Sequence, residues 1–116
     1  MIKKIIETAK ENIVLIDPYV DYASLDMFKT KNTTVSLAII TSSKNRLTKA
    51  EIELFKEQYN NLEITIDERY HDRYLIIDLA NFYHLGTSIN YLGKRLSQIT
   101  LIKDEDIIEI IKKRIN

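Results

Sequence analysis

The chain has 116 residues, of which 45% are hydrophobic and 29% charged, a balance typical of one globular domain and not of a disordered segment. Its 17 basic and 17 acidic residues cancel, so charge predicts no general affinity for nucleic acid. The lack of cysteine excludes disulfides and thiolate metal sites and favours a cytoplasmic protein. We expect no membrane span and no signal peptide, because no apolar run approaches the roughly 18 residues that a spanning helix needs.

Helical and strand patterns alternate along the first half of the sequence. Isoleucines at helical spacing come first, and an apolar run that ends at Asp17-Pro18 is typical of a buried strand. Thr48 and Glu51 stand at capping-box spacing before a further helical period. In chain order we expect a helix over 2–9, a strand over 13–16, a short helix over 25–30, a strand over 35–40, a polar loop over 42–46 and a helix over 48–60. Met1 directly precedes the first helix, which favours an independent chain over a fragment.

Strands dominate the second half, until a closing helix. Leu62, Ile64 and Ile66 alternate with polar residues, which is the period of a half-exposed strand. We expect strands over 62–66, 74–77, 82–85 and 99–102, a helical or looped segment over 90–95, and a last helix capped by Asp104. The core-facing side chains of that helix are expected to be Ile107, Ile108, Ile110, Ile111 and Ile115. These elements predict one α/β domain over residues 1–116, with a mixed central sheet flanked by helices on both faces.

His71 and His84 are the two histidines of the chain, and His71 has the richer chemical context. The period of a strand would place His71 and Arg73 on one face, where an imidazole nucleophile and a guanidinium could act on the same phosphate. Asp78 falls at an odd spacing from both and is expected to have a structural role. The simpler interpretation of any single histidine is a side chain hydrogen-bonded to backbone, and for His84 we keep the structural interpretation of a half-exposed strand residue.

The pattern His71-x-Arg73-x4-Asp78 resembles the H-x-K-x4-D motif of the phospholipase D superfamily, whose members include lipid phosphodiesterases and small nucleases. The similarity extends over three blocks in order, Ile16–Asp21, Tyr70–Asp78 and Tyr83–Ser88, and so covers most of the chain. These blocks are similar to the phospholipase D-like module of bacterial and phage proteins, which often lies behind an ORF6N-type DNA-binding domain.

This resemblance implies a phospholipase D-like sandwich and a metal-independent phosphodiesterase that needs no cofactor. In the family, one histidine attacks the phosphodiester to form a phosphohistidine and a second histidine protonates the leaving group. A chain with one motif therefore implies a homodimer whose two motifs share a cleft. The residues implied are the catalytic His71, Arg73 and Asp78 and the substrate-binding Ser88, Asn90, Gln98 and Asp17.

A nuclease is expected in preference to a lipase, because the chain has no membrane-binding segment. Nucleic acid and a DNA-binding protein or domain are the expected partners, in addition to the second copy of the chain. The preference over a lipase follows from the resemblance and the missing membrane segment, and not from the net charge.

Three departures from the family pattern keep a second interpretation open. Arg73 replaces the family's lysine, the G-S-x-N segment matches imperfectly around Gly86, and Gln98 stands where active members carry a carboxylate that orients the histidine. Glutamine cannot stabilise an imidazolium by charge, so Asp72 and Asp17 are the candidates to compensate. The alternative is a catalytically weak or inactive module that binds a phosphate-bearing ligand or mediates protein assembly.

Overall fold

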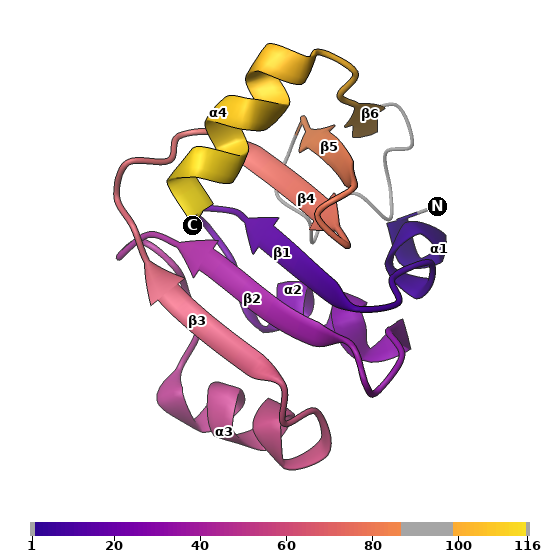
Figure 1. Ribbon diagram of the computed structural model, residues 1–116. Helices are drawn as coiled ribbons and strands as arrows, with labels where there is room; N and C mark the ends of the chain where they lie inside the picture. The colour runs from indigo at the N-terminus through magenta and orange to yellow at the C-terminus, as the bar shows by residue number, and fades with distance from the viewer. Residues whose placement is uncertain (1, 87–98, 116) are drawn as a thin grey trace.

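The computed structural model describes residues 2–86 and 99–115, which form an α/β fold around a six-stranded mixed sheet (Figure 1). The elements are α1 (Ile2–Glu7), β1 (Asn12–Ile16), α2 (Tyr22–Met27), the 3₁₀ turn η1 (Phe28–Thr30), β2 (Ser36–Thr41), α3 (Lys49–Gln58), β3 (Leu62–Ile66), β4 (Arg73–Ile77), β5 (Asn81–Leu85), β6 (Ile99–Leu101) and α4 (Glu105–Ile115). The expected α/β class is thus confirmed. The segment expected over 90–95 lies outside the described residues.

The strand order β3-β2-β1-β4-β5-β6 determines which strand ends meet. Strands β1, β2 and β3 are parallel, with Leu15 beside Ile39 and Ile39 beside Ile64. Strand β4 runs antiparallel to β1, and β5 antiparallel to β4. The carboxyl ends of β1, β2, β3 and β5 and the amino end of β4 therefore lie along one edge, the carboxyl edge of the sheet.

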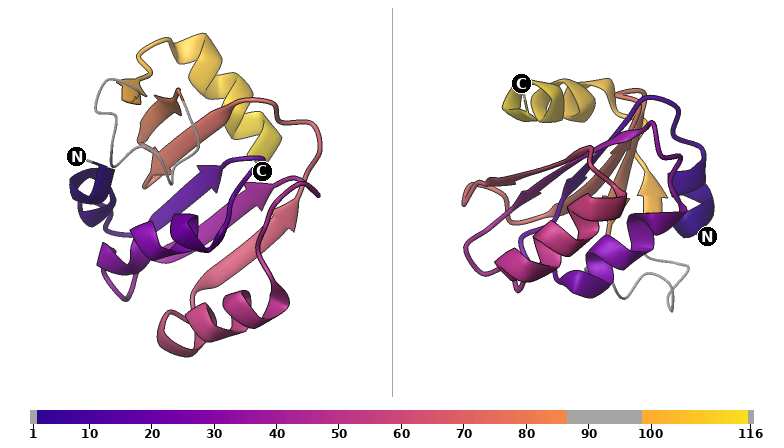
Figure 2. Two further views of the ribbon diagram at one scale, coloured as in Figure 1. Left: turned by 180° about the vertical axis from the view of Figure 1, so that it is seen from behind. Right: turned by 90° about the horizontal axis from the view of Figure 1, so that it is seen from below.

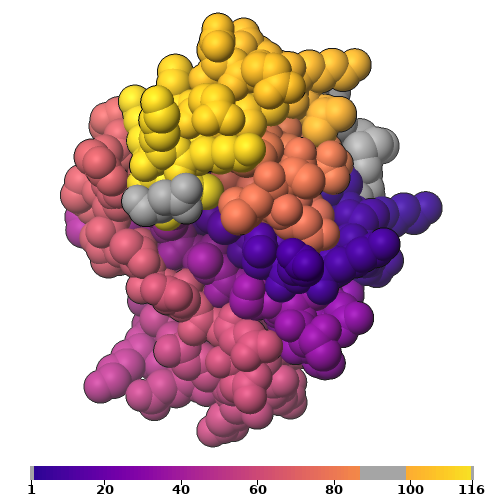
Figure 3. All heavy atoms as spheres, in the orientation of Figure 1, coloured from indigo at the N-terminus to yellow at the C-terminus, as the bar shows by residue number. Residues whose placement is uncertain are grey.

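Helices cover both faces of the sheet, as expected (Figure 2). On one face α1, α2, η1 and α3 pack their buried side chains, such as Ile6, Leu25 and Phe55, against the strands. On the other face α4 places Ile111 over Ile76. Figure 3 shows α4 over one part of this second face, while β3 and α3 form another part of the visible surface. Within residues 2–86 and 99–115, each helix is too short or too polar to cross a bilayer.

Helices α2 and α3 both begin with a capping box. Thr48 accepts a hydrogen bond from the amide of Glu51, whose carboxylate accepts one from Thr48, which confirms the predicted capping box of α3. Asp21 and Ser24 form a second capping box at α2. The helix expected over 25–30 consequently begins three residues earlier, at Tyr22, and ends in the 3₁₀ turn.

The prediction that all five isoleucines of α4 face the core is wrong for two of them. Ile107 and Ile110 are 43% and 51% exposed. Ile111 is buried, and Ile108 and Ile115 pack beside it at the i, i+3 and i+7 spacing of one helical stripe. Five isoleucines span more of the helix circumference than one contact with a sheet can cover. The predicted cap is present, because Asp104 accepts a hydrogen bond from the amide two residues on.

Candidate functional site

Several turns meet at the carboxyl edge, the position where sites in α/β sheets usually open. They are residues 17–19 after β1, residues 42–44 after β2 and residues 67–72 between β3 and β4. Arg73, the first residue of β4, pairs with Leu85 at the end of β5 and lies at the same edge. The fold therefore brings His71, Arg73 and Asp17 to one end of the sheet, although they come from two distant parts of the sequence.

Asp17 holds the turn after β1 in place. Its side chain is fully buried, and its Oδ1 atom accepts a hydrogen bond of 2.9 Å from the amide of Tyr19. The same oxygen lies 3.6 Å from Nε of Arg73, an ion pair longer than a hydrogen bond. The Arg73 guanidinium also lies over the Tyr19 ring, 5.5 Å from its centroid. A fully buried carboxylate therefore positions both Tyr19 and Arg73.

A pocket of about 200 Å³ opens beside this turn. Its lining residues are Pro18, Tyr19, Ser42, Lys44, Glu68, Tyr70 and His71. His71 is exposed, and the imidazole makes no hydrogen bond to any described residue. An imidazole without such a hydrogen bond and a lysine that lines the same pocket are groups that bind a phosphate oxygen.

Backbone and side-chain hydrogen bonds fix the turn that carries Lys44. The Ser42 hydroxyl donates to the carbonyl of Pro18 at 2.7 Å and accepts from the amide of Lys44 at 3.0 Å. The carboxylate of Glu68 accepts from the amide of Ser43 at 2.5 Å and from its hydroxyl at 3.1 Å. The pocket is therefore tied together across β1, β2 and β3 before any ligand binds.

The carboxylate next to His71 is engaged elsewhere. Oδ1 of Asp72 lies 2.7 Å from Nε2 of His84 and accepts a hydrogen bond from the amide of Arg73. His84 is half-buried on β5, as expected of a strand residue, and its ring makes an edge-to-face contact with the Tyr74 ring. Neither Asp72 nor Asp17, the two residues expected to compensate for Gln98, is hydrogen-bonded to His71.

Asp78 lies at the opposite end of β4 from Arg73. Its carboxylate accepts hydrogen bonds from the amides of Lys10, Glu11 and Asn12, and so fixes the turn between α1 and β1. Burial raises the pKa of the Asp78 carboxyl, but these three amides lower it by more, and the net pKa is below the ordinary value. This geometry gives Asp78 a structural role, as its position in the sequence suggested.

Three expected site residues, Ser88, Asn90 and Gln98, lie outside the described residues. Leu85 and Ile99, which stand on either side of them in the sequence, pair across β5 and β6. Arg73 pairs with Leu85 as well, so this pair is at the carboxyl edge.

Sequence reasoning missed Tyr19, Lys44 and Glu68 as members of the site. Each of them lies two or three residues beyond the end of a parallel strand, and this position is the signal that could have found them. The hydrophobic periodicity of the sequence could not show that β1, β2 and β3 are adjacent and parallel. It therefore could not predict that the three turns line one pocket.

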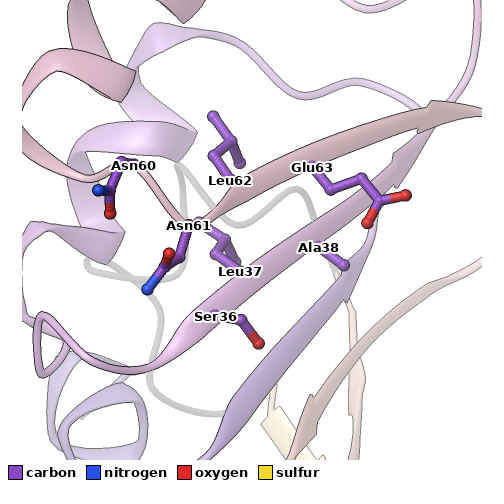
Figure 4. Close-up of a pocket in the computed structure, with 7 residues that line it drawn as sticks. All are labelled: Ser36, Leu37, Ala38, Asn60, Asn61, Leu62 and Glu63. Carbon is purple, nitrogen blue, oxygen red and sulfur yellow. The ribbon is translucent and has the colours of Figure 1, made fainter.

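A second pocket, of about 300 Å³, lies at the other end of β2 and β3 (Figure 4). It is lined by Ser36, Leu37, Ala38, Asn60, Asn61, Leu62 and Glu63. No basic side chain is among these residues, so this pocket does not offer the cations that a phosphate requires. Among residues 2–86 and 99–115, no cluster of three or more histidine, aspartate or glutamate side chains could hold a metal ion.

No family model and no curated protein sequence matches the chain.

Proposed function

We propose that the chain is a phospholipase D-like, metal-independent phosphodiesterase, and specifically a nuclease that works as a homodimer. The observation that carries the proposal is the exposed His71, which lines a pocket with Lys44 and stands two residues before Arg73, the ion-pair partner of Asp17. The three sequence blocks that resemble the superfamily add support, since two of them supply the turn after β1 and the start of β4. Such a nuclease would act in the cytoplasm, the compartment that the cysteine-free sequence favours.

The reaction would begin with a neutral His71. Its imidazole nitrogen attacks phosphorus, a P–N bond forms, and the P–O bond to the leaving group breaks. His71 of the partner subunit, in its protonated form, gives its proton to the departing oxygen. Water then attacks the phosphorus, a P–O bond forms, the P–N bond to His71 breaks, and the water gives up a proton to that second imidazole as the phosphate product is released. Lys44 and Arg73 would offset charge on the phosphoryl oxygens in both steps.

The test is cleavage of single- and double-stranded DNA and RNA, and of a chromogenic phosphodiester, in excess EDTA. Wild-type protein should cleave at least one of these substrates. His71→Asn, which removes the nucleophile, should lower the rate by at least about 10²-fold. His84→Asn is the matched control, because it removes the other histidine, which lies outside the pocket and pairs with Asp72. Equal rates for wild type and His71→Asn would contradict the proposal.

A second function has a specific observation in its favour: Asp72 pairs with His84 and leaves His71 without a described carboxylate partner. An imidazole that no carboxylate orients is a poorer nucleophile but still binds phosphate. The second candidate is thus a module that binds a phosphate-bearing ligand, or assembles with a partner, without cleaving. No cleavage by wild type, together with oligonucleotide binding that His71→Asn and Lys44→Ala weaken, would favour it.

A further inference from the structure

Tyr19 is an exposed aromatic side chain that lines the pocket at the carboxyl edge. It is 46% exposed and lines the pocket with Lys44 and His71. Neither the reaction above nor phosphate binding needs an aromatic ring at this position. An exposed ring beside phosphate ligands therefore needs its own explanation.

Contacts within the protein hold the backbone that carries the ring. The carboxylate of Asp17 accepts from the amide of Tyr19, and Pro18 restricts the backbone just before it. The next residue, Val20, is fully buried, and its carbonyl accepts from the amide of Arg46 at 2.8 Å. A side chain on so fixed a backbone loses little conformational entropy when it binds a ligand.

One face of the ring already has a partner. The Arg73 guanidinium lies over the ring at 5.5 Å from its centroid, a cation–π contact that fixes the ring orientation. A planar ligand would stack on the opposite face. The ring thus lies beside Lys44 and Arg73, the two cations that the proposed function assigns to phosphate. This arrangement matches a nucleotide, which carries a flat base next to a phosphate.

We propose that Tyr19 stacks on an unpaired base of a single-stranded nucleic acid whose phosphate His71 and Lys44 bind. This inference rests on the proposed phosphodiester site and specifies its substrate class. A base inside a duplex has both faces stacked on its neighbours and cannot contact the ring unless it leaves the helix. A phospholipid has a phosphate but no planar group beside it. Single strands should therefore bind better than either.

Equilibrium binding separates the base from the phosphate. The probes are a fluorescent single-stranded oligonucleotide, the same strand with abasic sites throughout its centre, its duplex, and vesicles of phosphatidylcholine with phosphatidylglycerol. Wild type should bind the intact strand roughly 5- to 150-fold more tightly than the abasic strand, the range that stacking on one aromatic side chain produces. Raising the salt concentration should weaken the binding of both strands by the same factor, because salt acts on the phosphate contacts. The ratio of the two dissociation constants should therefore stay unchanged.

Variants then assign the effect to the ring. Tyr19→Ala should bind the intact strand only as tightly as the abasic strand, whereas Tyr19→Phe should retain the preference. Leu54→Ala is the matched control, since Leu54 is a similarly exposed apolar side chain, 56% exposed, on α3. This substitution should leave the affinities for the intact and abasic strands unchanged. Light scattering on each variant checks that the oligomeric state is the same as that of wild type.

Several results would overturn the inference, and they differ from failure of the proposed function. Equal binding of intact and abasic strands, with Tyr19→Ala without effect, would remove the stacking role and leave the phosphodiester site standing. Failure of both strands to bind would remove both proposals. Tighter binding of vesicles than of oligonucleotides, lost in Tyr19→Ala, would assign the ring to a lipid surface. A Tyr19→Ala protein that dissociates into monomers would assign it to the subunit interface.

Discussion

Asp17 and Asp78 are both acidic residues next to a strand end, and the carboxylates of both contact other groups of the protein. Asp17 fixes Tyr19 and Arg73 at the carboxyl edge, and Asp78 fixes three backbone amides at the opposite edge. The odd spacing of Asp78 from His71 predicted a structural role, which its contacts with the three amides support, whereas the family resemblance implied a catalytic one. The contact of Asp17 with Arg73 was not predictable from the local sequence, because Arg73 belongs to β4, which lies far from Asp17 along the chain.

Replacing Asp78 should destabilise the protein in a pH-dependent way. Asp78→Ala leaves three amides without their acceptor and places alanine at a φ of 55°, so we expect a loss of about 1–3 kcal/mol at pH 7. Because the folded pKa is lowered, the charge-dependent part of this stability is present above the ordinary pKa of about 3.9 and disappears as the pH falls through the folded pKa.

Urea unfolding of wild type and Asp78→Ala at pH 7 and pH 3 measures this difference. The gap between the two proteins should narrow at pH 3. Asp78→Asn, which tolerates the left-handed backbone and keeps one acceptor oxygen, should lose less than Asp78→Ala at pH 7. A gap of equal size at both pH values would show that the carboxylate charge contributes nothing.

Tyr70 should tolerate loss of its hydroxyl. The side chain is 5% exposed, and the hydroxyl has no hydrogen-bond partner within the described part of the chain. Burial also raises the pKa of this hydroxyl. Tyr70→Phe removes an unsatisfied polar group, so the free energy of unfolding should stay the same or rise by up to about 1 kcal/mol. Thermal unfolding checks this, with Tyr70→Ala, expected to cost about 3–5 kcal/mol, as the control for ring packing. A large loss in Tyr70→Phe would reveal a partner for the hydroxyl.

At the scale of elements, the turn between β4 and β5 carries a conformational cost. Asp78 and Leu79 have φ values of 55° and 51°, in the left-handed region that suits glycine. Leu79 is 44% exposed, so its side chain contributes little packing there. Leu79→Gly should stabilise the protein by about 0.5–1 kcal/mol in chemical denaturation. Leu79→Ala keeps the β-carbon and should give no gain. Equal gains from both variants would mean that the exposed leucine, and not its backbone, causes the cost.

Helix α4 shows what hydrophobic periodicity can and cannot determine. The sequence predicted the helix and its cap, but the prediction placed five isoleucines on the core-facing side of the helix, and only three of them pack there. We expect Ile110→Lys to change the free energy of unfolding by no more than about 0.5 kcal/mol, whereas Ile111→Ala should cost about 2–5 kcal/mol, because Ile111 is buried. Urea denaturation compares the two. A loss of several kcal/mol in Ile110→Lys would place that side chain in a contact surface.

For the whole molecule, the α/β class and every strand of the described residues were predictable, and the site was predictable only in part. Periodicity tells which residues face a core, but strand order depends on contacts between distant segments. His71 and Arg73 were found because they are close in sequence. Tyr19 and Lys44 join them only because β1, β2 and β4 are neighbours in the sheet, which no local pattern encodes.

In the proposed mechanism, two copies of His71 act together on one phosphodiester. Mixing wild type with His71→Asn in equal amounts, unfolding and refolding them together, and assaying cleavage in EDTA tests it directly. If each site needs a His71 from both subunits, the mixture should retain about a quarter of the activity of wild type alone at the same total protein concentration. Retention of about half would show that each chain works independently, and would contradict the shared site.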